Sequence, residues 1–188
     1  MKTSVLALFL AATLAGAPHA LAQTSDGRPA LTEAEKPIRI SGLGIRVSDL
    51  DRSLKFYTEV LGFVKTADVR MTGAWIEEII GLKGVEGLVA FVELPGGGGP
   101  RIELLEYVAP AGGALPENSA ANTRGLRHVA FRVDDIAGMA AKLRAAGVTL
   151  FSDPVKVPQG VVKFAAGDKA LCYFLDPDGT ILELCEYR

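Results

Sequence analysis

Three side chains of this 188-residue chain could together hold a metal ion or move a proton. His128 lies in GLRHVAF, Glu103 in RIELLEY and Glu183 in LELCEY, and all three segments are rich in apolar residues. Two carboxylates flanked by leucines are costly to bury without a partner. An imidazole and two carboxylates suit Zn²⁺, Ni²⁺, Mn²⁺ or Fe²⁺, with positions left for water and a ligand. Arginines could neutralise the same carboxylates, so the residue types alone leave metal binding and ion pairing open.

The elements that must position these side chains occur twice in the sequence. The segment 42–62, GLGIRVSDLDRSLKFYTEVLG, can be aligned with 128–147, HVAFRVDDIAGMAAKLRAAG. Each copy reads as an alternating strand, an Asp at a helix N-cap and an amphipathic helix closed by glycine. Each copy also ends alike, in IELLEY or LELCEY. Between these ends, a short helix is expected in AWIEEIIGL and strands in FVKTADVRM, GLVAFVEL, VTLFSDP, VVKFAAG and ALCYFLDP.

The order βαβββ, repeated, predicts an α+β fold in which two modules form a curved mixed sheet around a cleft, with helices outside. Period-two alternation then sorts the side chains of each strand between the two faces. In the first strand, Ile45 and Val47 are expected under the helix, and Arg46 toward the cleft. The same parity places the following residues on the cleft face: Gly42, Gly44, Glu103, Leu105, Tyr107, His128, Ala130, Arg132, Glu183, Cys185 and Tyr187.

The N-terminal segment predicts export. A lysine, a short apolar run and the small-residue site Ala20-Leu21-Ala22 are typical of a cleaved signal peptide. The run is too short for a confident membrane span, so we expect a periplasmic or secreted protein that does not associate with the membrane after cleavage. The expected organisation is a signal peptide over 1–22, a flexible lead-in over 23–38, module one over 39–108, a linker over 109–124 and module two over 125–188.

Composition narrows the classes of partner. The net charge is −2 at pH 7, and no basic stripe of the kind that binds nucleic acid is visible. Of the two histidines, His19 falls in the expected signal peptide, which leaves His128 as the imidazole of the mature chain. A small-molecule ligand is therefore the expected partner, and a homodimer is compatible with the sequence without being required by it.

The two cysteines, Cys172 and Cys185, flank the turn DPDGT. If this turn joins antiparallel strands, the two residues face each other across it, and a disulfide is geometrically feasible in an oxidising compartment. Two buried free thiols are the alternative reading, and the sequence leaves both open.

The repeat resembles the vicinal oxygen chelate superfamily, which includes glyoxalase I, methylmalonyl-CoA epimerase, extradiol dioxygenases and the fosfomycin and bleomycin resistance proteins. The resemblance runs from about Arg39 to the C-terminus and rests on GIRVSDLDRSLKFYTEVLGF, RIELLEY, GLRHVAFRVDDI and DPDGTILELCEY. It implies four metal-ligand positions, one on the first and one on the last strand of each module. Three of them match Glu103, His128 and Glu183, whereas the fourth matches Gly42, which has no side chain.

This resemblance implies two functions. A three-ligand site with water in the fourth position would suit a glyoxalase-type lyase or isomerase that moves a proton beside a carbonyl of a small anionic substrate, with Glu183 as base and Glu103 as partner. The extradiol dioxygenases of this superfamily have an iron site with two histidines and one carboxylate. The expected mature chain has a single histidine, so dioxygenase chemistry is not expected. Alternatively, the chain lost the metal and sequesters a small molecule in the cleft without catalysis, as bleomycin resistance proteins do.

The resemblance also implies residues that hold the substrate. Arg46 and Arg124 match positions that grip an anionic ligand in glyoxalase I, and Arg132 lies on the same cleft face. Tyr107 stands where that family has an asparagine contact to glutathione. This departure, together with export, argues against glutathione itself. The alternative for Arg46 is an ion pair with an inward glutamate, and for Arg124 a solvated surface position.

Overall fold

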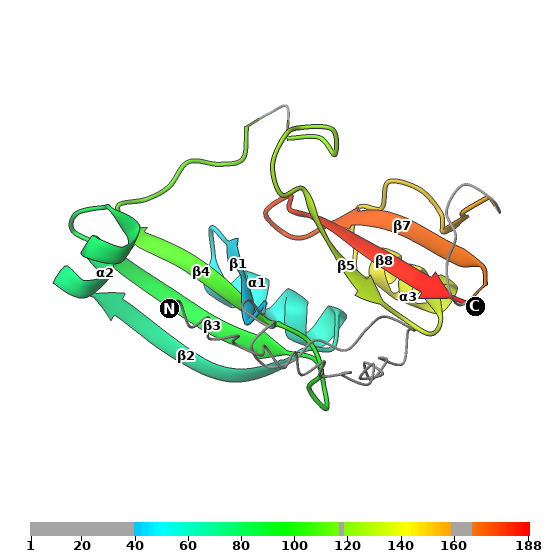
Figure 1. Ribbon diagram of the computed structural model, residues 1–188, viewed down its shortest axis with the longest axis horizontal. Helices are drawn as coiled ribbons and strands as arrows, with labels where there is room; N and C mark the ends of the chain where they lie inside the picture. Colours follow the sequence, from blue (N-terminus) through cyan, green and yellow to red (C-terminus); the bar gives the residue numbers. More distant parts are fainter. Residues whose placement is uncertain (1–39, 117–118, 159–166) are drawn as a thin grey trace, which may run out of the picture. The chain divides into compact units, whose positions relative to one another are not determined.

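The strands hydrogen-bond into two four-stranded mixed sheets, one for each copy of the repeat (Figure 1). The computed structural model describes residues 40–116, 119–158 and 167–188. The first sheet has the order β1-β4-β3-β2 and consists of β1 (Gly42–Arg46), β4 (Arg101–Ala109), β3 (Glu86–Glu93) and β2 (Val64–Thr72). The second has the order β5-β8-β7-β6 and consists of β5 (His128–Arg132), β8 (Ile181–Tyr187), β7 (Lys169–Leu175) and β6 (Val155–Lys156). The predicted α+β class and the doubled βαβββ order are confirmed.

Each first strand leads into a helix that begins at the predicted aspartate. The carboxylate of Asp49 accepts a hydrogen bond of 2.9 Å from the backbone N–H of Arg52 at the start of α1 (Leu50–Lys55). Asp135 does the same for the N–H of Gly138 in α3 (Ile136–Ala145), also at 2.9 Å. These bonds satisfy donors that a helix start leaves unpaired, which is why the sequence marked both positions.

The ends of these helices also follow the sequence. After α1 the chain continues as a π-helical turn, η2 (Phe56–Val60). Gly62 then takes a φ of 84° and Gly147, which follows α3, a φ of 77°. Both values lie in the left-handed region, where glycine is favoured because it has no Cβ. The short helix expected in AWIEEIIGL forms as α2 (Ala74–Ile80).

One predicted strand does not form. The segment 148–154, VTLFSDP, contributes a single bridge between Leu150 and Phe174, and the two-residue β6 follows it. Ser, Asp and Pro favour turns, and proline has no N–H for a sheet ladder, so the strand signal is interrupted before it can pair. The expected strand VVKFAAG spans 161–167, and its residues 161–166 lie outside the described residues, as do the expected signal peptide and lead-in. Within the described ranges, no helix is long and apolar enough to cross a membrane.

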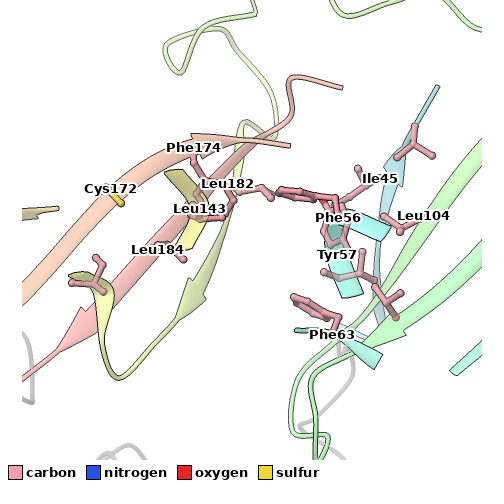
Figure 2. Close-up of a cluster of buried hydrophobic side chains, with 14 residues drawn as sticks. Ile45, Phe56, Tyr57, Phe63, Leu104, Leu143, Cys172, Phe174, Leu182 and Leu184 are labelled. Atoms are coloured by element: carbon pink, nitrogen blue, oxygen red, sulfur yellow. The ribbon is translucent and has the colours of Figure 1, made fainter. Parts of the chain in front are cut away.

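The helix-packed sides of both sheets contribute to one hydrophobic cluster, shown in Figure 2. The predicted alternation is observed, since Ile45 and Val47 of the first strand segment are buried. Tyr57 of η2 belongs to this cluster, which includes residues of both modules. The other members that the figure labels are Phe56, Phe63, Leu104, Leu143, Cys172, Phe174, Leu182 and Leu184. We call this cluster the shared core. Glu103 and Glu183 alternate with its leucines, so each glutamate lies on the face of its sheet that is turned away from the shared core, which we call the opposite face.

A polar network joins the β7–β8 turn of module two to the start of α1 in module one. Asp178 accepts hydrogen bonds from the backbone N–H of Ser48 at 3.1 Å and from Nη2 of Arg52 at 2.8 Å. Nearby, the hydroxyl of Tyr57 donates to Asp176 at 3.3 Å. Partial burial would raise the pKa of the Asp178 carboxyl, but the hydrogen bonds from Ser48 and Arg52 outweigh it and lower this pKa.

Replacing Asp178 with asparagine is expected to lower the free energy of unfolding by about 1–3 kcal/mol, because charge-assisted hydrogen bonds across the two modules are weakened. A carboxyl whose pKa is lowered by folding stabilises the native state above its unfolded pKa, about 3.9, and this contribution is lost as pH falls from that value through the lower pKa of the folded state. Denaturant unfolding at pH 7 and at lower pH should therefore show a smaller loss on acidification for Asp178→Asn than for the wild type.

The matched control is Asp68→Asn on β2, which removes an exposed ion pair with Lys65. Exposed pairs contribute little, so this variant should change the unfolding free energy by about 0.5 kcal/mol or less. Equal effects of the two substitutions would contradict the role given to Asp178.

The cysteines are free and buried, and the strand register explains why. In the β7–β8 pair, Cys172 lies opposite Leu184, and Cys185 lies opposite Leu171. The expectation that the two cysteines oppose each other was wrong by one residue. Because adjacent residues of a strand point to opposite faces, the thiol of Cys172 enters the shared core and that of Cys185 points to the opposite face. Of the two alternatives, the structure therefore has two buried thiols.

Candidate functional site

In module two, His128 and Glu183 are brought together. The Nε2 atom of His128 on β5 lies 3.3 Å from Oε2 of Glu183 on β8. The imidazole packs against the ring of Tyr173, with ring centroids 5.0 Å apart. The histidine side chain is 40 % exposed and that of the glutamate 7 %. Nitrogen and oxygen ligands bind Zn²⁺ at about 2.0–2.2 Å, so two such atoms at this separation fit one divalent ion.

Two residues that sequence reasoning missed complete the surroundings of Glu183. The Nζ atom of Lys169 lies 3.7 Å from Oε1 of Glu183. Tyr173 lies opposite Glu183 across the β7–β8 ladder and interacts with the same carboxylate. Burial would lower the pKa of Lys169, but its hydrogen bond to Tyr187 and the charge of Glu183 outweigh burial and raise it. Burial, followed by the charge of Glu183, raises the pKa of Tyr173. At neutral pH the ammonium and the phenol both keep their protons, so the carboxylate faces two donors.

The alternation of residues in the β7 segment places Lys169 and Tyr173 together, but it does not reveal which face they share. In KALCYFL, period-two alternation places both on one face. That this face is the one carrying Glu183 follows only from the register, which sets Tyr173 opposite Glu183.

Module one repeats the geometry with one ligand missing. In the parallel pair β1–β4, Gly42 lies opposite Arg101 and Gly44 opposite Glu103. The pair β5–β8 has the same register, with His128 opposite Ile181. The registers thus agree with the alignment of Gly42 with His128. A Cβ at Gly42 would lie 3.0 Å from Oε1 of Glu103, so this glycine faces its glutamate as the histidine faces Glu183.

Glu103 does not join His128 and Glu183 in one cluster. Within residues 40–116, 119–158 and 167–188, no three His, Cys, Asp or Glu side chains gather closely enough to hold a metal ion. The reason is the shared core, because the faces that carry the glutamates are each turned away from it. Glu103 instead pairs with Arg101, whose Nη2 lies 3.6 Å from its Oε1. One chain therefore presents two half-sites, a His–Glu pair and a single glutamate.

The expected ligand-binding arginines lie around these half-sites. The guanidinium carbon of Arg46 is 5.6 Å from the ring centre of Tyr107, rather than against an inward glutamate. Arg46 also lines a pocket of about 300 Å³ with Ser48, Asp178 and the linker segment 112–116. Arg132 lies over Tyr187 at 5.4 Å, on the same face as Glu183. Arg124 is exposed in the turn before β5.

Fold, internal repeat and register define a family. The chain belongs to the Glyoxalase/Bleomycin resistance protein/Dioxygenase superfamily, whose sequence profile matches residues 39–184. Among curated relatives, a 2-epi-5-epi-valiolone epimerase of Actinomyces sp. is 32% identical over 154 residues, which cover 78% of each chain. A lactoylglutathione lyase of Schizosaccharomyces pombe is also 32% identical over 154 residues, covering 74% of this chain but only 44% of the lyase. A mouse mitochondrial methylmalonyl-CoA epimerase is 29% identical over 122 residues, covering 63% of this chain and 59% of the epimerase.

Solved structures share the fold. A glyoxalase family protein from Bacillus cereus superimposes with a TM-score of 0.68 at 26% identity, covering 84% of this chain and 99% of that protein. A glyoxalase family protein from Enterococcus faecalis gives a TM-score of 0.53 at 26% identity, covering 79% of this chain and 97% of that protein.

Proposed function

We propose that this protein is a metal-dependent lyase or isomerase of the glyoxalase type, which transfers a proton beside the carbonyl of a small anionic compound. The observation that carries the proposal is the His128–Glu183 pair, in which an imidazole nitrogen and a carboxylate oxygen lie 3.3 Å apart. The relatives named as two epimerases and a lyase support it. Inverting a carbon centre that bears hydrogen requires a proton to be removed and returned, which a positioned carboxylate can do.

The donor set fits half of a metal site. His128 and Glu183 supply the nitrogen and oxygen ligands that Zn²⁺ and similar ions take, whereas protein sites of this kind hold the ion by three or four residues. When bound, the ion would polarise an oxygen of the substrate and so acidify the neighbouring C–H bond. The third ligand proposed for the site is Glu103.

A homodimer supplies Glu103 most simply. The two half-sites of one chain are on faces turned away from the shared core, so a second copy is needed to bring a Glu103 to a His128–Glu183 pair. Self-complementary association of this kind is common among homo-oligomers. The homodimer is therefore part of the proposal. The metal site is complete only in the dimer and is incomplete in an isolated chain.

The remaining residues bind and orient the substrate. Glu183 would take the proton from the carbon and return it, with Glu103 as its partner on the other side. The ammonium of Lys169 would hold one Glu183 oxygen in place. Arg46, Arg124 and Arg132 would hold the anionic part of the substrate, since guanidinium groups match carboxylates in shape and charge.

Hydrogen–deuterium exchange tests this function directly. Pyruvate is a small anionic carbonyl compound whose methyl protons can be followed by NMR in D₂O. Protein loaded with Zn²⁺, Ni²⁺ or Mn²⁺ and then desalted should accelerate this exchange, and chelation with EDTA should remove the acceleration. Glu78→Gln on the exposed side of α2 is the control and should leave the rate unchanged. Exchange no faster than in buffer with the same metal would refute catalysis of this type.

A binding protein without catalysis is the second candidate, and Gly42 favours it. Loss of a ligand side chain weakens a metal site while leaving the ligand-binding arginines in place. Metal-independent binding of a small anion, with no proton exchange, would establish this alternative.

Export remains a proposal that the N-terminal sequence supports. Fractionation of the producing cell would test it, with the mature N-terminus expected at Gln23.

A further inference from the structure

Arg101 has no counterpart in the other half of the repeat. It occupies the β4 position that Ile181 has in β8, since each lies opposite the first residue of its neighbouring strand, Gly42 or His128. Its guanidinium carbon lies 4.3 Å from the ring centre of Phe91, and its Nη2 atom lies 3.6 Å from Oε1 of Glu103.

These contacts reproduce those of the histidine in module two. There the imidazole pairs with Glu183 and packs on Tyr173, and Tyr173 lies opposite Glu183 across the ladder. In module one the guanidinium pairs with Glu103 and packs on an aromatic ring that lies opposite Glu103 in the same way. A side chain on a neighbouring strand thus makes, in module one, the two contacts that the first-strand histidine makes in module two.

The absence of a side chain at Gly42 leaves room for Arg101 to make these contacts. A Cβ at this position would lie 3.0 Å from Oε1 of Glu103 and 3.2 Å from the carbonyl oxygen of Arg101. A side chain there would push the Glu103 carboxylate away from its observed place beside the guanidinium. The missing ligand and the arginine are therefore two parts of one arrangement.

We propose that Arg101 binds the carboxylate of a small monoanionic ligand at the module-one half of the site, alongside the arginines already assigned to the anionic part of the substrate. This inference deepens the proposed function, on which it rests, by naming the charged group that module one recognises. A guanidinium has five N–H donors, and one contact of 3.6 Å with Glu103 leaves donors for a ligand. The stack on Phe91 holds the guanidinium plane, which favours bidentate contact with a carboxylate.

Local charge selects a carboxylate over a phosphate. Arg101 and Glu103 together are neutral, so attraction to the arginine and repulsion by the glutamate grow in the same proportion with ligand charge. The cost of removing an ion from water grows faster than its charge, which disfavours a ligand with two negative charges. A carboxylate carries one charge. Beside it, Gly44 leaves the strand uncovered next to the Leu105 side chain, which offers an apolar surface to the carbon part of the ligand.

Pyruvate binding to EDTA-treated protein, followed by ligand-observed NMR, tests the assignment without metal and without turnover. Arg101→Gln should weaken binding about tenfold or more, which corresponds to about 1.4 kcal/mol, and Arg101→Lys should weaken it less. The Arg101 side chain is 45% exposed, so the variants are expected to fold, which circular dichroism checks. Arg70→Gln on β2, where an exposed arginine pairs with Glu86, is the matched control and should bind like wild type.

Equal affinities of wild type and Arg101→Gln, or no pyruvate binding by wild type, would overturn the inference. Tighter binding of inorganic phosphate than of pyruvate would overturn the choice of carboxylate. The two proposals can fail separately. If pyruvate binding depends on Arg101 but no metal-dependent proton exchange is found, the proposed function fails and the role of Arg101 stands.

Discussion

Replacing Glu183 with glutamine is expected to slow metal-dependent proton exchange by about 10²–10⁴-fold, the usual contribution of a positioned general base. The amide keeps the size of the carboxylate but cannot accept a proton at neutral pH. The side chain of Glu183 is only 7% exposed and has His128 and Lys169 beside it. A carboxylate from the buffer is therefore not expected to reach this position and act as the base in the variant. The rate should be measured on pyruvate in D₂O at saturating metal, which separates the loss of the base from weaker metal binding.

Two comparisons make this result specific. Glu78→Gln, on the exposed side of α2, carries the same chemical change and should leave exchange unaffected. Circular dichroism of Glu183→Gln should remain close to wild type, which shows that the variant folds. An exchange rate within a factor of about two of wild type would remove Glu183 from the mechanism.

Replacing Phe174 with alanine is expected to lower the free energy of unfolding by about 3–5 kcal/mol. Phe174 is fully buried in the cluster to which both modules contribute, and it lies on β7 opposite Leu182. Removing the ring leaves a cavity in this shared cluster, and the closely packed side chains around it relax only in part. Urea unfolding monitored by circular dichroism measures the loss.

Phe151 is the matched control for this substitution. It is 51% exposed, and its alanine variant should lose about 1 kcal/mol or less. Similar losses for the two phenylalanines would show that the shared core does not unite the modules. Separate unfolding transitions in the wild type would show the same, since one core predicts one cooperative transition.

The fold was largely accessible from the sequence because the information is local and repeated. Alternation of apolar residues marked the strands, and it correctly assigned Ile45 and Val47 to the buried face. Asp49 and Asp135 marked the helix starts because their carboxylates bond to backbone N–H groups three residues on. Comparison of the two copies also gave the correspondence of Gly42 with His128, with which both ladder registers agree.

Strand register was not accessible, and the cysteines show why. Asp176 accepts hydrogen bonds from the backbone N–H groups of Asp178 and Thr180, at 3.0 and 2.7 Å. The strands pair symmetrically about Asp178 of this turn, one residue away from the expected pairing. A shift of one residue sends Cys172 and Cys185 to opposite faces. The roles of Lys169 and Arg101 depend on register in the same way, because each is defined by the glutamate beside it.

The position of Glu103 depends on how the two modules pack. The sequence placed it on one face with His128 and Glu183, which parity alone permits. Burial of both helix-packed faces in a single cluster then separates it from them within one chain. This arrangement arises from long-range contacts such as the hydrogen bond of Tyr57 to Asp176, for which no local pattern exists.

The central claim is that His128 and Glu183 hold a divalent metal ion, and metal content per protomer tests it most directly. Wild type and His128→Ala should be stripped with EDTA, loaded in turn with Zn²⁺, Ni²⁺ and Mn²⁺, desalted and analysed for metal by elemental analysis. The account predicts one ion per protomer in wild type for at least one metal and its loss in His128→Ala. Wild type that retains no metal, or His128→Ala that retains as much as wild type, would contradict it.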